Sequence, residues 1–276
     1  MEKNLFSISA TELGKESKIP IRVLGEAGEV FYEMALEMIT EIQKNNEKGK
    51  STVFICPVGP VGQYPIFVRL VNAHKISLKN VYFINMDEYL DNEKQWISID
   101  HPLSFRGFMK KNVYDQIDSN LVMSEDHRIF PEPGKEKEIE ALITRLGGVD
   151  ICFGGIGING HMAFNEPPEP SENVTDEEFK NRPTRILSIS RETRTINASG
   201  ALGGAIAAMP TCCITIGMKE ILSARKLRLY CFRDWHRAVV RQAAYGEVTS
   251  AFPVSFAQQH PDAEIIITQN VAQVPY

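Results

Sequence analysis

Short, continuous apolar runs constrain the fold of this chain more than any other feature, because each is followed at once by a glycine-, proline- or acid-rich segment or by a polar turn. Strands that are apolar on both faces and alternate with helices are typical of a largely parallel sheet. The sequence therefore predicts an α/β fold in which helices flank a largely parallel sheet. The runs are residues 52–56, 81–84, 149–153, 212–216 and 227–232.

Helical segments are expected around these strands. In residues 27–43, apolar side chains recur at helical spacing with charged residues between them, which indicates an amphipathic helix packed on the sheet. A second helical segment covers residues 66–71, after a loop at 57–65. A third begins near Leu103 and runs to Val113, after a loop at 91–100.

The composition argues against several functional classes. The 276 residues suffice for one large or two small α/β domains. The formal charge of -5 arises from mixed signs without a basic stripe, which argues against nucleic acid as a partner. No stretch approaches the roughly 20 apolar residues of a membrane span, and the first residues lack a secretory layout. We therefore expect a cytoplasmic protein that has no membrane partner.

Ligands of parallel sheets bind at the carboxyl ends of the strands. This rule directs attention to residues 57–65, 85–89, 154–167 and 232–237. The second of these segments carries Asp87 directly after an apolar strand, where a partly desolvated carboxylate suits a base that removes a proton from carbon. A helix N-cap is the simpler explanation for an aspartate at this position, and both stay open.

The glycine-rich stretch 154–167 is the most informative part of the sequence. Closely spaced glycines let the backbone turn sharply and approach a ligand, and here they deliver His161 and Glu166. An imidazole and a carboxylate so close in sequence suit acid–base work. The alternative is a structural turn in which His161 only satisfies hydrogen bonds of the loop.

Taken together, these stretches resemble the glucosamine-6-phosphate deaminase family. The similarity runs in the family's order across most of the chain, and its strongest part is the motif that ends in residues 163–167, Ala-Phe-Asn-Glu-Pro. That ending separates the chain from the related 6-phosphogluconolactonases, which share only the beginning of the motif. The other matching stretches are residues 85–89, 101–105, 193–194, 214–217, 242–244 and 260–261.

The resemblance implies one domain over residues 1–276 with a modified Rossmann-like sheet. It also implies an aldose-to-ketose conversion with loss of ammonia, without a metal or a redox cofactor. Asp87 would move the proton between C2 and C1 of the opened sugar. His161 would open the pyranose ring by moving a proton between O1 and O5, and Glu166 and Asn159 would orient its imidazole. A base, an acid and a fixed anion clamp are what enolisation of a sugar phosphate requires.

For the anion clamp, the resemblance points to the loop that begins at Gly59 and to two arginines. Backbone amides and guanidinium groups suit phosphate oxygens. Each arginine has a simpler alternative, an ion pair at the protein surface. The expected phosphate-binding residues are Gly59, Gly62, Gln63, Tyr64, Arg194 and Arg237.

The chain departs from the family pattern at two places in this site. The family has an aspartate where this chain has Asn159, so the imidazole of His161 loses a second negative charge. The analogous exchange in serine-protease triads costs about 10⁴ in turnover, so slow or differently arranged ring opening is expected. Residues 61–65, Val-Gly-Gln-Tyr-Pro, replace the family's Thr-Gly-Gly-Thr/Ser-Pro pattern, which removes two hydroxyl donors and reshapes the phosphate pocket.

Several alternatives therefore stay open. The departures favour an isomerase or deaminase for a different sugar phosphate, or a weakly catalytic protein that binds a sugar phosphate without releasing ammonia. A 6-phosphogluconolactonase-like hydrolase, with His161 activating water, is a minor alternative because it leaves Asp87 without a task. The expected partner is a small phosphorylated sugar. The family includes monomers and larger assemblies, so a homo-oligomer is also open.

Overall fold

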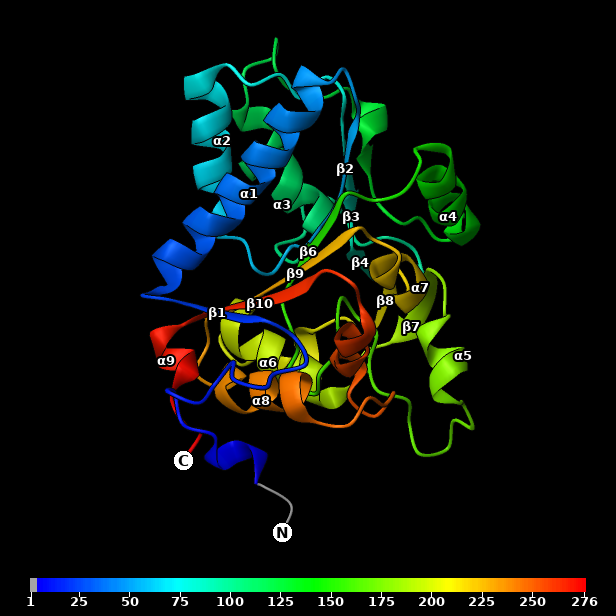
Figure 1. Ribbon diagram of the computed structural model, residues 1–276. Coiled ribbons are helices and arrows are strands. Elements are labelled where there is room, and N and C mark those ends of the chain that lie inside the picture. The colour runs from blue at the N-terminus through cyan, green and yellow to red at the C-terminus, as the bar shows by residue number, and fades with distance from the viewer. Residues whose placement is uncertain (1–3) are drawn as a thin grey trace.

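A parallel sheet of seven strands forms the centre of the computed structural model, which describes residues 4–276 (Figure 1). Residues 1–3 of the predicted domain lie outside the described residues. Every neighbouring pair of strands in this sheet is parallel, so the predicted α/β class is confirmed. In spatial order the strands are β1 (Ile21–Leu24), β10 (Ala263–Thr268), β9 (Lys226–Cys231), β6 (Ile151–Gly154), β2 (Thr52–Cys56), β3 (Val81–Asn85) and β5 (Arg128–Ile129).

Helices cover both faces of this sheet, and each face has its own apolar core (Figure 1). One core lies beneath α1 (Ala27–Glu47), α2 (Gln63–His74) and α3 (Phe105–Asn112). The other lies beneath α4 (Glu136–Arg145), α5 (Asp176–Lys180), α7 (Met218–Leu222), α8 (His236–Tyr245) and α9 (Gln269–Ala272). Short 3-10 helices are η1 (Leu5–Ser7), η2 (Tyr114–Gln116), η3 (Glu125–His127), η4 (Ile206–Ala208) and η5 (Pro253–Gln259).

The two cores explain why the strands are continuously apolar. In β2, Val53 and Ile55 point into one core, whereas Phe54 and Cys56 point into the other. Successive side chains of a strand alternate between the faces of a sheet, so a strand covered on both faces must be apolar at every position. The amphipathic helix predicted at residues 27–43 is the observed α1, and its apolar side belongs to the core beneath α1, α2 and α3.

A second sheet of three antiparallel strands lies beside the first: β4 (Asp87–Leu90), β8 (Cys212–Thr215) and β7 (Arg185–Ser188). The apolar run at 212–216 was expected among the parallel strands, and this is corrected by the observed antiparallel pairing. β8 is the central strand of the small sheet and is mostly buried there. A buried central strand has an apolar run in either kind of sheet, so the pattern could not distinguish them.

Five strands were not predicted, and each contains a charged residue: Arg22 in β1, Asp87 in β4, Arg128 in β5, Arg185 in β7 and Glu264 in β10. Arg22 and Glu264 lie on adjacent strands and form an ion pair of 3.0 Å. The pair compensates two charges that interrupt the apolar pattern. The loop predicted at 57–65 is also shorter than expected, because α2 begins at Gln63.

The two sheets are joined at Met86, between β3 and β4. The backbone N–H of Met86 donates to the carbonyl of Cys56 in the large sheet, at 2.9 Å. The carbonyl of Met86 accepts from the N–H of Ile216, which follows β8, at 2.8 Å. The chain therefore leaves the large sheet and enters the small one within a single residue, directly before Asp87.

Arg241 of α8 ties both ends of the described chain to the core that lies beneath α8. Its guanidinium is fully buried and donates to the carbonyls of Ile8, Arg237 and Ala272 at 2.7 to 2.9 Å. Its hydrogen bonds within residues 4–276 all go to backbone carbonyls, and no carboxylate of these residues pairs with it.

We predict that Arg241→Met lowers the free energy of unfolding by about 3 kcal/mol, because buried carbonyls lose their donors. Urea unfolding followed by circular dichroism measures the loss. Arg69→Met, at an exposed position of α2, is the matched control. Equal stability of the two variants would contradict this role of Arg241.

Candidate active site

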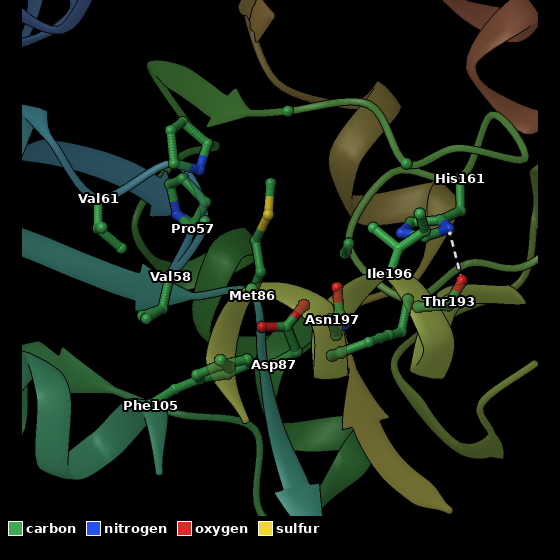
Figure 2. A pocket seen from close by; sticks show the side chains of 18 of the residues that line it. Pro57, Val58, Val61, Met86, Asp87, Phe105, His161, Thr193, Ile196 and Asn197 are labelled. Carbon is green, nitrogen blue, oxygen red and sulfur yellow. Dashed lines mark hydrogen bonds between the residues drawn. The ribbon is translucent and has the colours of Figure 1, made fainter. Parts of the chain in front are cut away.

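A cavity of about 450 Å³ opens at the carboxyl ends of β2, β3, β6 and β9. Its size suits a small ligand. All four segments singled out by the carboxyl-end rule contribute to its lining, which confirms that they converge. Figure 2 shows Asp87 and His161 among the side chains around this cavity. The small sheet and α6 (Arg191–Ala201) complete the wall with Tyr89, Thr193 and Asn197.

Asp87 is a buried carboxylate, only 7% exposed, at the first position of β4. No protein donor within residues 4–276 makes a hydrogen bond to its side chain. Burial raises the pKa of Asp87 well above its usual range, and the charge of neighbouring Glu88 raises it further. Such a carboxylate binds a proton readily, which is the property that a general base needs.

Glu88 has the opposite environment, although it follows directly in the chain. Its fully buried carboxylate accepts five hydrogen bonds at the start of α3. These donors hold its negative charge in place and fix the helix end beside the cavity. The donors are the backbone N–H groups of Tyr89, Phe105 and Arg106 and the side chains of Ser104 and Arg106.

Asn159 lies between His161 and Glu166 and links them. Its Nδ2 donates to Oε2 of Glu166 at 2.6 Å, and its Oδ1 lies 2.7 Å from Nδ1 of His161. The direct distance from Nδ1 to Oε2 is longer, 3.7 Å. The expectation that both residues orient the imidazole therefore takes a specific geometric form, in which Glu166 acts through Asn159.

This chain of contacts fixes the tautomer of His161. An ionised carboxylate only accepts hydrogen bonds, so Glu166 must receive the amide N–H of Asn159. The amide oxygen of Asn159 then faces Nδ1 of His161, which must carry a proton to donate to it. Nε2 is left as the basic nitrogen of the neutral ring.

The surroundings of His161 favour the neutral form of its imidazole. Burial lowers its pKa, and the negative charge of Glu166 opposes this only in part. Thr193 Oγ1 lies 3.4 Å from Nδ1, the contact drawn as a dashed line in Figure 2. A neutral ring with a free Nε2 can accept a proton and return it.

Gly157 provides the space that this ring occupies. A side chain at position 157 would meet Nε2 of His161 at 2.3 Å and Cε1 at 2.1 Å. The backbone N–H of Gly157 also donates to the carbonyl of His161 at 2.9 Å. The glycine is thus required by the close approach of the imidazole to the loop.

The expected phosphate loop contributes to the cavity only in part. Gly59 lines the cavity, whereas Gly62, Gln63 and Tyr64 do not. Tyr64 is fully buried and its hydroxyl donates to the carbonyl of Pro57 at 2.5 Å. Gln63 is also fully buried, and its Nε2 donates to the carbonyl of Pro60 at 2.9 Å. The side chains of Gln63 and Tyr64 therefore support the turn before α2 from within the protein and do not line the cavity.

Arg194 and Arg237, the two expected clamp arginines, lie outside the cavity lining. Arg237 donates through Nη2 to the side chain of Asn270, near the C-terminal helix. Arg233 does line the cavity, and sequence reasoning did not single it out. The available signal was its place directly after the strand at 227–232, in a segment already marked as ligand-facing.

No group of three or more His, Cys, Asp and Glu side chains within residues 4–276 is placed to hold a metal ion. Over the same residues, no helix is both long and apolar enough to cross a membrane.

Comparison with known proteins gives relatives along most of the chain. The glucosamine-6-phosphate deaminase of Lachnoclostridium phytofermentans is 32% identical over 75% of this chain and 82% of its own length. That of Thermoanaerobacter pseudethanolicus is 30% identical over 89% of this chain and 92% of its own. The corresponding Caenorhabditis elegans protein is 31% identical over 84% of this chain and 83% of its own. No protein-family model matches the chain.

Solved structures share the fold. A monomeric glucosamine-6-phosphate deaminase superposes with a TM-score of 0.77 at 24% identity, over 91% of this chain and 98% of its own. A 6-phosphogluconolactonase from Trypanosoma cruzi superposes with a TM-score of 0.63 at 14% identity, over 91% and 95% of the two chains. The modified Rossmann-like architecture predicted from the sequence is confirmed by these similarities.

We predict that Asn159→Asp raises the pKa of His161 by about one pH unit or more, because a carboxylate within hydrogen-bond reach favours the imidazolium. An NMR titration of the imidazole Cε1–H measures this pKa directly. Asn92→Asp, an exposed position, is the control that adds the same charge elsewhere. An unchanged titration in Asn159→Asp would show that this side chain does not adjoin the ring.

Proposed function

Because the chain belongs to the glucosamine-6-phosphate deaminase family, we propose that it converts glucosamine-6-phosphate and water into fructose-6-phosphate and ammonia. The observation that carries this proposal is the placement of Asp87 and His161 on one cavity. Asp87 has the properties of a base that removes a proton from carbon. His161 has those of a neutral imidazole that accepts a proton and returns it. Aldose–ketose conversion of a cyclic sugar needs one of each.

Ring opening is the task proposed for His161. Its Nε2 accepts the proton of O1 and returns it to the ring oxygen O5, which breaks the C1–O5 bond and leaves an aldehyde at C1. Asn159 and Glu166 hold the ring in the tautomer that this transfer uses. The neutral Asn159 provides orientation without the charge that would stabilise an imidazolium, so the ring-opening step should be slower than with an aspartate.

Asp87 then carries out the isomerisation. Its carboxylate removes the proton from C2 of the open sugar while the ammonium group on C2 gives one of its protons to O1, which leaves a neutral enolamine and a protonated Asp87. Asp87 returns the proton to C1, and the nitrogen on C2 becomes an iminium group. Water adds to C2, and ammonia leaves to give the ketose. Burial of the carboxylate strengthens it as a base for this transfer.

The departures at residues 61–65 and at Asn159 support a second candidate, the same chemistry on a different amino-sugar phosphate. A weakly catalytic sugar-phosphate-binding protein would use the same cavity and release no ammonia. A lactonase would share the fold, as the structural similarity to 6-phosphogluconolactonases illustrates, but Asp87 would then have no role.

We place this activity in the cytoplasm, with a small phosphorylated sugar as the partner. The five cysteines of the chain are all free, including four that are buried, which suits a reducing compartment.

We predict that purified protein releases ammonia and fructose-6-phosphate in equal amounts from glucosamine-6-phosphate. Asp87→Asn should reduce kcat by about 10³ or more, because the amide cannot accept the proton from C2. Coupled enzymatic assays of both products give the measurement. Asp100→Asn, at an exposed loop position, should retain wild-type turnover. Absence of both products from folded wild-type protein would refute the deaminase assignment for this sugar.

The raised pKa of Asp87 predicts where activity is lost in acid. The deprotonated carboxylate is the active form, so kcat/KM should fall as the pH drops through a value above the ordinary aspartate pKa of about 3.9. Glu88→Gln removes a charge that raises this pKa, and it should move the acid limb to lower pH.

Comparing the pH profile of Glu88→Gln with that of the wild-type protein also separates the titration of Asp87 from that of His161. This is needed because protonation of His161 would reduce activity in acid as well. Removing the charge of Glu88 is expected to move only the limb that belongs to Asp87, since Glu166 is the charge that acts on His161. Glu138→Gln, on the exposed side of α4, is the control. An acid limb that stays in place in Glu88→Gln would assign the titration to a group other than Asp87.

A further inference from the structure

We infer that Arg233 binds the phosphate end of the substrate, a task expected of Arg194 and Arg237. The inference rests on the proposed function, because it names the residue that recognises the anionic end of the same sugar. It would make Arg233 a specificity-determining residue for phosphorylated over unphosphorylated amino sugars.

Arg233 is the one lysine or arginine among the described residues that line the cavity. It is exposed, and within residues 4–276 no carboxylate pairs with its guanidinium. The ring of Phe232 lies 5.5 Å below the guanidinium carbon and supports it from one side. An unpaired guanidinium at a cavity presents several N–H donors to an incoming anion.

Neither of the two arginines expected from the family lines the cavity, although the Nε of each is buried and has no hydrogen-bond partner among the described residues. Arg237 is held by Asn270, whose own amide donates to Asp234 at 2.5 Å. Its backbone carbonyl accepts from the buried Arg241, so the start of α8 is fixed with Arg237 on the side of the C-terminal helix. Arg194 is partly buried on α6 and does not line the cavity.

His236 positions the backbone that carries Arg233. Its Nδ1 accepts from the N–H groups of Phe232 at 3.2 Å and Arg233 at 2.9 Å. Its Nε2 lies 3.1 Å from the carbonyl of Ile156 in the glycine-rich loop. Burial lowers the pKa of His236 to about 4, so the ring is neutral and donates through Nε2. His236 therefore ties the segment of Arg233 to the loop that carries His161.

A chain of aromatic contacts places the start of α2 on the same side as Arg233. Phe232 packs edge-on against Phe31, with ring centroids 4.7 Å apart. Phe31 in turn fills the space beside Gly62, where an added side chain would meet its ring at 2.3 Å. The first backbone N–H groups of a helix lack intrahelical partners and favour an anion. The turn at residues 59–61, which leads into α2 and does line the cavity, thus lies on the same side of the cavity as Arg233.

The test measures binding without turnover, in the Asp87→Asn background. Isothermal titration with glucosamine-6-phosphate and with glucosamine separates recognition of the phosphate from recognition of the sugar. We expect Arg233→Gln to weaken glucosamine-6-phosphate binding by about 10-fold or more while leaving the affinity for glucosamine unchanged. Arg233→Lys should recover part of the loss, because it keeps the charge but not the bidentate geometry.

Three further variants act as comparisons: Arg194→Gln, Arg237→Gln and the exposed Arg69→Gln. Each should keep glucosamine-6-phosphate affinity within about 2-fold of the parent, since none lines the cavity. The inference is overturned if Arg233→Gln binds the phosphorylated sugar as well as its parent does. It is equally overturned if the parent shows no binding, or if the loss falls instead on Arg194→Gln or Arg237→Gln.

Turnover of the wild-type protein distinguishes this inference from the proposed function. Arg233-dependent binding without ammonia release would support the anion site and refute the deaminase. Ammonia release with a KM that does not change in Arg233→Gln would support the deaminase and overturn the role of Arg233.

Discussion

The change of sheet at Met86 is the constraint on which the site depends. One backbone hydrogen bond holds Met86 to Cys56 in the parallel sheet, and another holds it to Ile216 beside the antiparallel sheet. Because both bonds involve one residue, Asp87 starts a new strand at the point where the parallel strands end. The carboxylate is thereby buried at the edge where ligands of such sheets bind.

Asp87 and Glu88 are neighbours in the chain, but their carboxylates have opposite hydrogen-bonding environments. Glu88 receives five hydrogen bonds, whereas Asp87 receives none from the described protein and has a raised pKa. Elsewhere in the site, Glu166 fixes the amide of Asn159, and the amide oxygen of Asn159 in turn orients the imidazole of His161. Asn159 adds no charge. The result is a buried base and a neutral imidazole around one cavity, which agrees with proton transfer to and from a sugar.

Much of this arrangement follows from local sequence. Apolar runs predicted β2, β3, β6 and β9, and the carboxyl-end rule then predicted which loops surround the cavity. Pairing partners are not local, which is why the run at 212–216 was assigned to the wrong sheet. The orientation of side chains is not local either. Tyr64 turns away to the carbonyl of Pro57. The segment of Arg233 is held by contacts of its neighbours with residues distant in the sequence, His236 with Ile156 and Phe232 with Phe31.

A crystal structure of the Asp87→Asn variant with glucosamine-6-phosphate bound tests the central claim most directly, because one map places all three parts of the substrate. The account predicts C2 beside residue 87, the ring oxygen within hydrogen-bond reach of Nε2 of His161, and the phosphate between Arg233 and the turn at residues 59–61. A sugar bound with its phosphate at Arg194 or Arg237, or with C2 remote from residue 87, would contradict it.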